Sequence, residues 1–288
     1  QATHPSTFAQ LYRYQTTGHS NSSWYSIDGG IDYQRSFPVK GRLLTLSYKI
    51  DTNPSSSDSY TDYLDKQSDA AWDDFLDRLH DQHTDGSQRT TEHTFQADYT
   101  TPFAKLHTIE AGLKYILRNN SSENDRYEMG TFDENHSSHY KHRNDILAAY
   151  LGYGIKLKKW SGRMGLRYEH TLQDVDYELG RGQDFKKRFN DWVPSASIGW
   201  KPTQMSNLQL NYYMRIHRPG IWYLNPYLND ANPTSISQGN SRLDNEKSHS
   251  FVLSYSNFTP KLNFNASLRY GTTNNSIERV TRLEFGRA

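Results

Sequence analysis

Apolar and polar residues alternate along one segment after another of this chain, and this alternation limits its fold more than any other feature. Every second residue from Leu208 to Ile216 is apolar, and the residues between them are mostly polar. The same period-2 pattern recurs around residues 25–33, 44–50, 93–99, 109–117, 163–168, 192–200 and 262–270. Successive side chains of a strand point to opposite faces, so the pattern predicts an all-β protein whose sheet has one apolar and one polar face.

The connections between these segments are of two kinds. Short turns rich in Pro and Gly, near residues 38–41, 101–105, 158–162, 201–205 and 257–261, alternate with polar stretches near 52–88, 119–139, 178–188 and 217–247. We interpret the polar stretches as long loops at one end of the sheet. Short turns at one rim and long loops at the other are typical of bacterial outer-membrane barrels. Most predicted strands also reach the roughly 9–11 residues that a tilted strand needs to cross a bilayer. The pattern therefore predicts an antiparallel, up-and-down transmembrane β-barrel, present as about ten or eleven strands.

The polar face of the predicted sheet carries charges of both signs. Its charged positions predicted to face the barrel lumen are Glu110, Lys114, Arg118, Arg163, Arg167, Arg215 and Arg269. The apolar face ends repeatedly in Tyr or Trp, as in the aromatic girdles at membrane interfaces. In a soluble β protein the same aromatic residues would instead pack across strands, and alternation alone leaves this alternative open.

Composition excludes several classes of function. The 288 residues contain no cysteine, which excludes disulfides and cysteine-based metal or redox chemistry. A net charge of +1 gives no footprint for nucleic acid. No apolar run approaches the roughly 20 residues of a spanning helix. The sequence also lacks the phosphate-loop, dinucleotide, nucleophile-elbow and zinc-protease motifs, so we predict neither catalysis nor a cofactor.

Two polar stretches contain further candidate features. His136, His139 and His142 are possible metal ligands, although their spacing suits a helix better than the loop-to-strand passage expected there, and we favour a solvated loop without metal. In the segment 69–79, apolar residues recur at helical spacing between acidic residues. This spacing predicts a short amphipathic helix that packs on a neighbouring loop or on the barrel rim.

One block carries a resemblance to a known family. Its residues are Arg215, Arg218, Pro219, Trp222, Leu224, Asn225, Pro226, Gly239, Asn240, Leu243 and Glu246, placed between two predicted strands. The order Arg-x-x-Arg-Pro, aromatic, Leu-Asn-Pro, Gly-Asn-x-x-Leu and Glu resembles the outer-membrane β-barrel family of Bacteroidetes TonB-dependent receptors. The chain departs from that pattern at Ser241 and Asn245, where the family usually has proline.

The resemblance implies an importer in the outer membrane of a Gram-negative bacterium. Its barrel would have roughly 22 strands in outer-membrane lipid and a plug domain inside it. Its energy would come from the TonB system, and its ligand would be a small molecule or glycan whose identity the sequence does not give. Residues 1–288 would then be a partial barrel domain without the plug and the remaining strands. A passive barrel without a plug, and a soluble or surface-attached β-sheet binding module, are the alternatives.

The sheet of this chain is expected to stay open. Closing ten or so strands would crowd the long side chains of Arg118, Arg163, Arg167, Arg215 and Arg269 into a narrow interior. We therefore expect exposed edges near residues 5–15 and 276–284, with no hydrogen bonds between the first and last strands.

Overall fold

The computed structural model describes residues 2–3, 10–180, 182–225, 228–229 and 237–282. Its strands are β1 (Ala2–Thr3), β2 (Gln10–Trp24), β3 (Ile27–Ser36), β4 (Leu43–Ser68), β5 (Gln82–Phe103), β6 (His107–Glu128), β7 (Thr131–Phe132), β8 (Ser138–Lys156), β9 (Trp160–Leu179), β10 (Phe185–Trp200), β11 (Ser206–His217), β12 (Leu228–Asn229), β13 (Ser237–Gln238), β14 (Glu246–Phe258) and β15 (Asn263–Asn274). The helices are a 3₁₀ turn η1 (Ala70–Trp72), α1 (Asp73–Asp77) and α2 (Ile221–Leu224).

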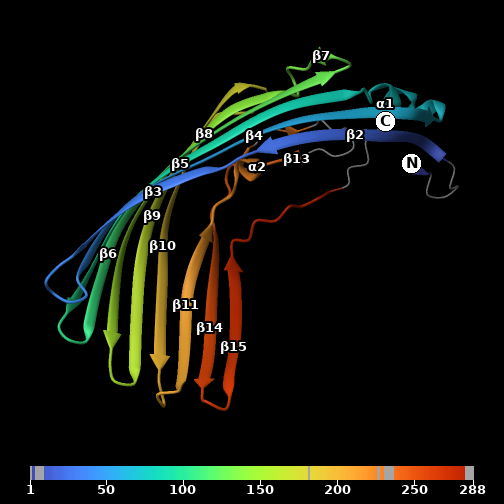
Figure 1. The fold of residues 1–288 in the computed structure, drawn as a ribbon. Coiled ribbons are helices and arrows are strands. Elements are labelled where there is room, and N and C mark those ends of the chain that lie inside the picture. The colour runs from blue at the N-terminus through green and yellow to red at the C-terminus, as the bar shows by residue number, and fades with distance from the viewer. Residues whose placement is uncertain (1, 4–9, 181, 226–227, 230–236, 283–288) are drawn as a thin grey trace.

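Thirteen strands of the described residues form one antiparallel sheet (Figure 1). Along it, β1, β2, β4, β5, β6, β8, β9, β10, β11, β14 and β15 follow one another, with β7 beside β6. β2 pairs with the second half of β4 and β3 with its first half, so β2 and β3 act as one interrupted edge strand. Successive long strands lie side by side, which confirms the predicted up-and-down topology.

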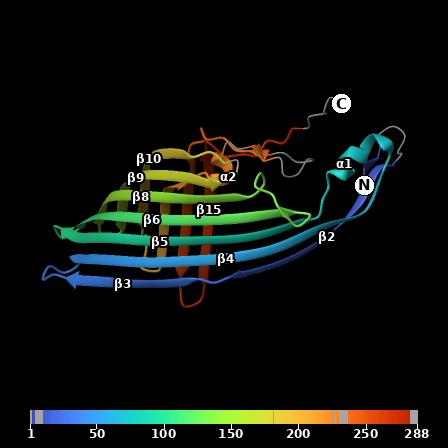
Figure 2. The same ribbon diagram turned by 90° about the horizontal axis from the view of Figure 1, so that it is seen from above.

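The sheet is curved and open, as expected (Figures 1 and 2). Among the described residues, β15 pairs only with β14, and β1 only with β2. The prediction of an edge strand near 276–284 was wrong for residues 276–282, because the last strand ends at Asn274. Asn275 follows with a left-handed φ of 57°, which turns the chain away from the sheet. Residues 5–9 and 283–284 lie outside the described part of the chain.

Three of the four predicted long loops are wrong for most of their length. β4 continues for 26 residues, far more than the roughly 9–11 that cross a bilayer, and stays paired with β5 as far as Thr61 opposite Gln82. β6 likewise runs to Glu128, and the connection from β9 to β10 shrinks to residues 180–184. These strand segments are polar on both faces. They therefore lack the apolar–polar alternation from which strands were predicted, although their backbones are paired in the sheet. The stretch 217–247 is a long excursion, as predicted.

The predicted helix within 69–79 is confirmed in a shorter form. Residues 70–77 form η1 and α1, and Leu76 and Leu79 are buried. The Trp72 and Phe75 rings lie 5.2 and 4.9 Å from the ring of Tyr12 on β2. A helix this short is not stable alone, so these contacts with the end of the sheet hold it in place.

The two faces of the sheet differ in polarity over the part that lies next to the short turns. One face, which we call the outer face, exposes apolar side chains at Leu113, Leu147, Leu151, Met164, Leu166, Ile198, Leu210 and Leu268. Aromatic pairs border this band. Trp160 and Trp200 stack at 5.5 Å beside the short turns, and the pairs Tyr48–Phe95, Tyr168–Trp192 and Tyr212–Phe251 lie 4.9–5.0 Å apart at its other border. An apolar band between two aromatic rows is the arrangement of a membrane-spanning barrel wall.

The other face, which we call the inner face, is concave. Figure 1 shows α2 and β13 within the curve of the sheet. Segments of the sheet beyond the second aromatic row, from β2, β4, β5, β6, β8, β9 and β10, form what we call the upper extension. No helix among the described residues is long and apolar enough to cross a membrane.

Candidate functional site

Charged side chains of the inner face are paired across strands. The strand register places Glu110, Lys114, Arg118, Arg163, Arg167, Arg215 and Arg269 on this one face. That this face lines a lumen stays a prediction. Arg163 forms an ion pair with Glu110, and Arg118 Nε donates to Glu92 Oε2 at 2.7 Å. The guanidinium of Arg215 lies 5.1 Å from the ring centroid of Tyr213. The inner face therefore holds both charge signs next to water.

The most buried charge of this face is Glu169 on β9. Its side chain is 2 % exposed and lies between the guanidinium groups of Arg167 and Arg218, each of which forms an ion pair with it. Arg218 also donates from Nε to Thr171 Oγ1 at 3.0 Å. Arg218 lies just beyond β11, and its burial lowers the pKa of its guanidinium below the ordinary value. A carboxylate taken out of water in this way is stable only with such close cationic partners.

A second anchor forms around Asp191 on β10. Asn245 Nδ2 donates to Asp191 Oδ2 at 2.5 Å, and Lys247 Nζ lies 3.1 Å from Asp191 Oδ1. Asp191 is almost fully buried and lies directly opposite Glu169 in the β9–β10 register. The two anchors therefore hold both ends of the excursion 218–245 against the same place on the inner face.

Residues of the family-like block also fold the excursion on itself. Leu224 is fully buried, and Asn225 Nδ2 donates to the Tyr177 hydroxyl at 2.7 Å. The Gly239 N–H donates to the Asn225 carbonyl at 2.9 Å, and the Asn240 N–H to the Tyr223 carbonyl at 2.6 Å. Pro219 is buried, the Leu243 N–H bonds to the Asn240 carbonyl, and Glu246 accepts a hydrogen bond from the Ile277 N–H. Pro226 lies outside the described residues. The described residues of the block are thus tied to one another and to the inner face by these contacts.

The two departures from the family pattern take part in these contacts. Asn245 supplies the amide that bonds to Asp191, and the Ser241 carbonyl accepts from Lys187 Nζ at 3.3 Å. Proline has no side-chain donor, so a proline in place of Asn245 could not make this contact. Sequence reasoning noted both residues but missed Thr171 and Asp191, because a buried polar partner leaves no periodic signal.

The three histidines of the candidate metal cluster contact different partners. His136 Nδ1 lies 2.5 Å from Asp133 Oδ2, His139 Nε2 lies 2.8 Å from Asp125 Oδ1, and His142 Nδ1 lies 3.2 Å from the Asn120 amide. No group of three potential metal ligands converges anywhere in the described ranges. Asp133 lies between β7 and β8, outside the membrane-level part of the sheet. Burial acts to raise the pKa of its carboxyl. Hydrogen bonds from the His136 side chain and from nearby N–H groups outweigh burial and hold that pKa below its ordinary value.

A curved antiparallel sheet with an apolar outer band, aromatic borders and a charged inner face defines the wall of an outer-membrane β-barrel. The sequence matches the outer membrane protein beta-barrel family over residues 35–285, and the chain belongs to this family. It is therefore a protein of the outer membrane, which is incompatible with the soluble binding module considered above. None of the curated proteins matches the sequence.

Solved structures share the fold at low sequence identity. The ferric yersiniabactin uptake receptor FyuA from Yersinia pestis is similar with a TM-score of 0.53 and 12 % identity, over 93 % of this chain and 47 % of that one. A double mutant of the hemophore receptor HasR from Serratia marcescens, in complex with HasA and heme, has a TM-score of 0.50 and 16 % identity, over 87 % of this chain and 45 % of that one. The FrpB iron transporter from Neisseria meningitidis has a TM-score of 0.50 and 10 % identity, over 87 % of this chain and 46 % of that one. The chain spans about half the length of these proteins.

Proposed function

We propose that this chain is part of the barrel of a TonB-dependent receptor that takes up a scarce nutrient across the outer membrane. The observation that carries the proposal is the inner face, which is charged along the strands and partly covered by the anchored loop 218–245. A wall that only had to enclose side chains would need apolar packing on this side. A polar wall suits a wide barrel whose lumen holds a separate domain and water.

In this proposal a plug domain, supplied by another part of the full protein, fills the lumen. It contacts the inner face at its exposed charges, among them Arg163 and Arg215. The structurally similar proteins include an uptake receptor for ferric yersiniabactin and an iron transporter, which supports import as the activity. The upper extension and its loops would capture the ligand, and TonB would supply the energy that moves the plug. The partners are then outer-membrane lipid on the outer face, the plug, the TonB system and a small-molecule or glycan ligand. Origin in a Bacteroidetes bacterium stays a prediction.

The buried anchors give the loop 218–245 a mechanical part in this proposal. A plug that moves must slide past a wall that does not follow it. An ion pair from Arg218 to Glu169 and an amide contact from Asn245 to Asp191 fix the loop to β9 and β10, because breaking either one leaves a buried carboxylate with one partner fewer. The loop would thereby stay in place while the plug is displaced.

The test uses the full-length gene in its native host. Growth on a limiting nutrient should require both the gene and intact TonB, and the purified receptor should conduct little current in a planar bilayer because the plug closes it. As a control, a variant without the plug should form an open pore. Nutrient uptake that continues without TonB, together with a large conductance of the complete receptor, would instead identify a passive barrel.

A further inference from the structure

An exposed indole stands apart from the aromatic rows that border the membrane band. Trp24 ends β2 and is 78 % exposed. It lies opposite Ser55, which in turn lies opposite Gln88, and Gln88 opposite Ser122. These residues share the inner face with Arg118 and Lys114 in the same unbroken register. Trp24 is therefore on the concave side, within the upper extension, and its ring does not face lipid.

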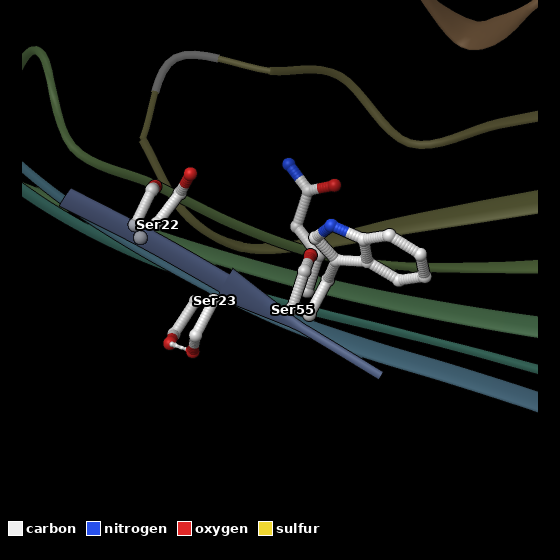
Figure 3. Close-up of a pocket in the computed structure, with 8 residues that line it drawn as sticks. Ser22, Ser23 and Ser55 are labelled. Atoms are coloured by element: carbon white, nitrogen blue, oxygen red, sulfur yellow. Dashed lines mark hydrogen bonds between the residues drawn. The ribbon is translucent and has the colours of Figure 1, made fainter. Parts of the chain in front are cut away.

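The surroundings of this indole form a shallow depression of about 370 Å³ (Figure 3). On the inner face it is lined by Ser22, Trp24, Ser55, Ser57, Gly86 and Gln88. Figure 3 shows Ser22 and Ser55 on one side of the strands and Ser23 on the other, where its hydroxyl lies 2.9 Å from that of Ser56. A Cβ atom at Gly86 would lie 2.7 Å from Ser57 Oγ, so glycine keeps the floor of the depression open.

None of the residues that line this depression is charged, in a chain where 23 % of residues are. Hydroxyl groups both donate and accept hydrogen bonds, and the Gln88 amide offers two donors and an acceptor. The indole adds a large flat ring whose electron-rich face attracts polarised C–H groups. The site thus matches an uncharged molecule that has hydroxyl groups around its rim and C–H groups on its face. A pyranose sugar has this construction.

A second depression follows on the same face, closer to the membrane. It is lined by residues that include Asp28, Lys49, Asp51, Glu92 and Thr94. At about 3.3 Å per residue, Asp51 lies roughly 13 Å along β4 from Ser55. Carboxylates accept hydrogen bonds from hydroxyl groups, and a ligand that reaches both depressions must be elongated.

We infer that the inner face of β2, β3 and β4 is a binding platform for a neutral oligosaccharide, with one sugar ring stacked on Trp24 and the following rings directed toward Asp51. The inference rests on the proposed import function, and it names the ligand class of that receptor. Trp24 sets the position of the stacked ring. Ser22, Ser55 and Gln88 bind its hydroxyl groups. The lack of charge around Trp24 disfavours an anionic ligand at this point.

The platform is tested with the full-length receptor in detergent micelles. Isothermal titration calorimetry would measure binding of maltohexaose, cellohexaose, xylohexaose and mannohexaose, with a ferric catecholate siderophore as the anionic comparison. At least one hexasaccharide is expected to bind. Trp24→Ala should weaken its binding about tenfold or more, and Trp24→Phe should weaken it less because a smaller ring remains. Gln88→Ala should weaken binding severalfold.

Matched controls lie on the outer face. Trp192 is an exposed tryptophan facing away from the lumen, and Ser87 adjoins Gln88 on the same strand. Trp192→Ala and Ser87→Ala should leave saccharide binding unchanged. The inference is overturned if only the siderophore binds, or if Trp24→Ala binds the saccharide as tightly as the unaltered receptor. Saccharide binding that needs Trp24, without uptake that needs TonB, would uphold the platform and overturn the import function.

Discussion

The membrane-level part of the sheet and its upper extension are built from the same strands but follow different sequence rules. In β4, Leu44, Leu46 and Ile50 face outward against polar inward neighbours, whereas Ser55, Ser56 and Ser57 put the same side chain on both faces. Backbone pairing with β5 continues across both parts without a break. The alternation of apolar and polar residues therefore depends on the medium that each face contacts, and it is absent where water covers both faces.

In the membrane-level part of the sheet, the inner face must be charged and the outer face must be uncharged. Glu169 lies beside Tyr168 in the chain, one buried inside and one in the aromatic border outside. Reversing either requirement should cost stability, whereas similar changes in the upper extension should cost little.

The largest effect is expected from Glu169→Gln. The change replaces the buried carboxylate by a neutral amide and leaves the largely buried Arg218 without an ion-pair partner there, and breaking a buried ion pair in this way costs about 3–5 kcal/mol. Urea unfolding of the full barrel in lipid vesicles would measure the loss. Glu110→Gln is the control, because its partner Arg163 is mostly exposed and such a pair contributes about 1 kcal/mol or less. Equal losses for the two variants would contradict the assignment of Glu169 as a buried anchor.

A somewhat smaller effect is expected from Leu151→Arg. Leu151 is exposed on the outer face within the apolar band, and arginine near the bilayer midplane costs about 2–4 kcal/mol. Ser87→Arg places the same side chain on the outer face of the upper extension, where surface substitutions change stability by about 0.5 kcal/mol or less. The same unfolding assay compares them. If Ser87→Arg proved as costly as Leu151→Arg, the upper extension would also be in lipid.

The smallest effect concerns the connection between β7 and β8. The pKa of Asp133 is held below its ordinary value in the folded state, so the carboxylate stabilises this connection fully above about pH 4, the range of an unfolded aspartate. That stabilisation is lost as the pH falls through the lower folded value. Amide exchange at His136 and Ser137, corrected for intrinsic rates, should speed up on acidification more than exchange in the middle of β8. Asp133→Asn should exchange fast already at neutral pH, and a pH-independent rate in the unaltered protein would contradict the role of Asp133.

Much of the fold could be predicted from the sequence because lipid imposes period 2 on the outer face. Leu208 to Ile216 and Leu262 to Tyr270 were placed correctly for this reason, as were the turns near Pro38 and Pro260. The upper extension was mistaken for loops because residues such as Asn53 to Ser59 pair in the sheet through backbone hydrogen bonds without needing apolar side chains on one face. Propensity gives no help there, since Ser, Asp and Asn favour turns in isolation.

The candidate site was predicted only in part. Arg218 and Glu246 were found from the family-like block, and Arg167 from its place on the polar face. Asp191 was missed because it comes from a strand distant in sequence from the loop that it holds. Trp24 of the proposed platform was missed because it ends a strand without apolar–polar alternation, and only the register with Ser55 shows which face it occupies.

The most direct test of this account is a spin-label scan along β4, from Leu44 to Tyr60, in the full barrel reconstituted in lipid vesicles. Accessibility to oxygen, which concentrates in lipid, should peak at every second residue from Leu44 to Ile50 and then fall. From Thr52 onward, accessibility to a water-soluble nickel complex should be high on both faces, while the labels keep the restricted mobility of a strand. Continued oxygen alternation through Ser56, or fast isotropic motion from Asn53 onward, would contradict a sheet that leaves the membrane and continues into water.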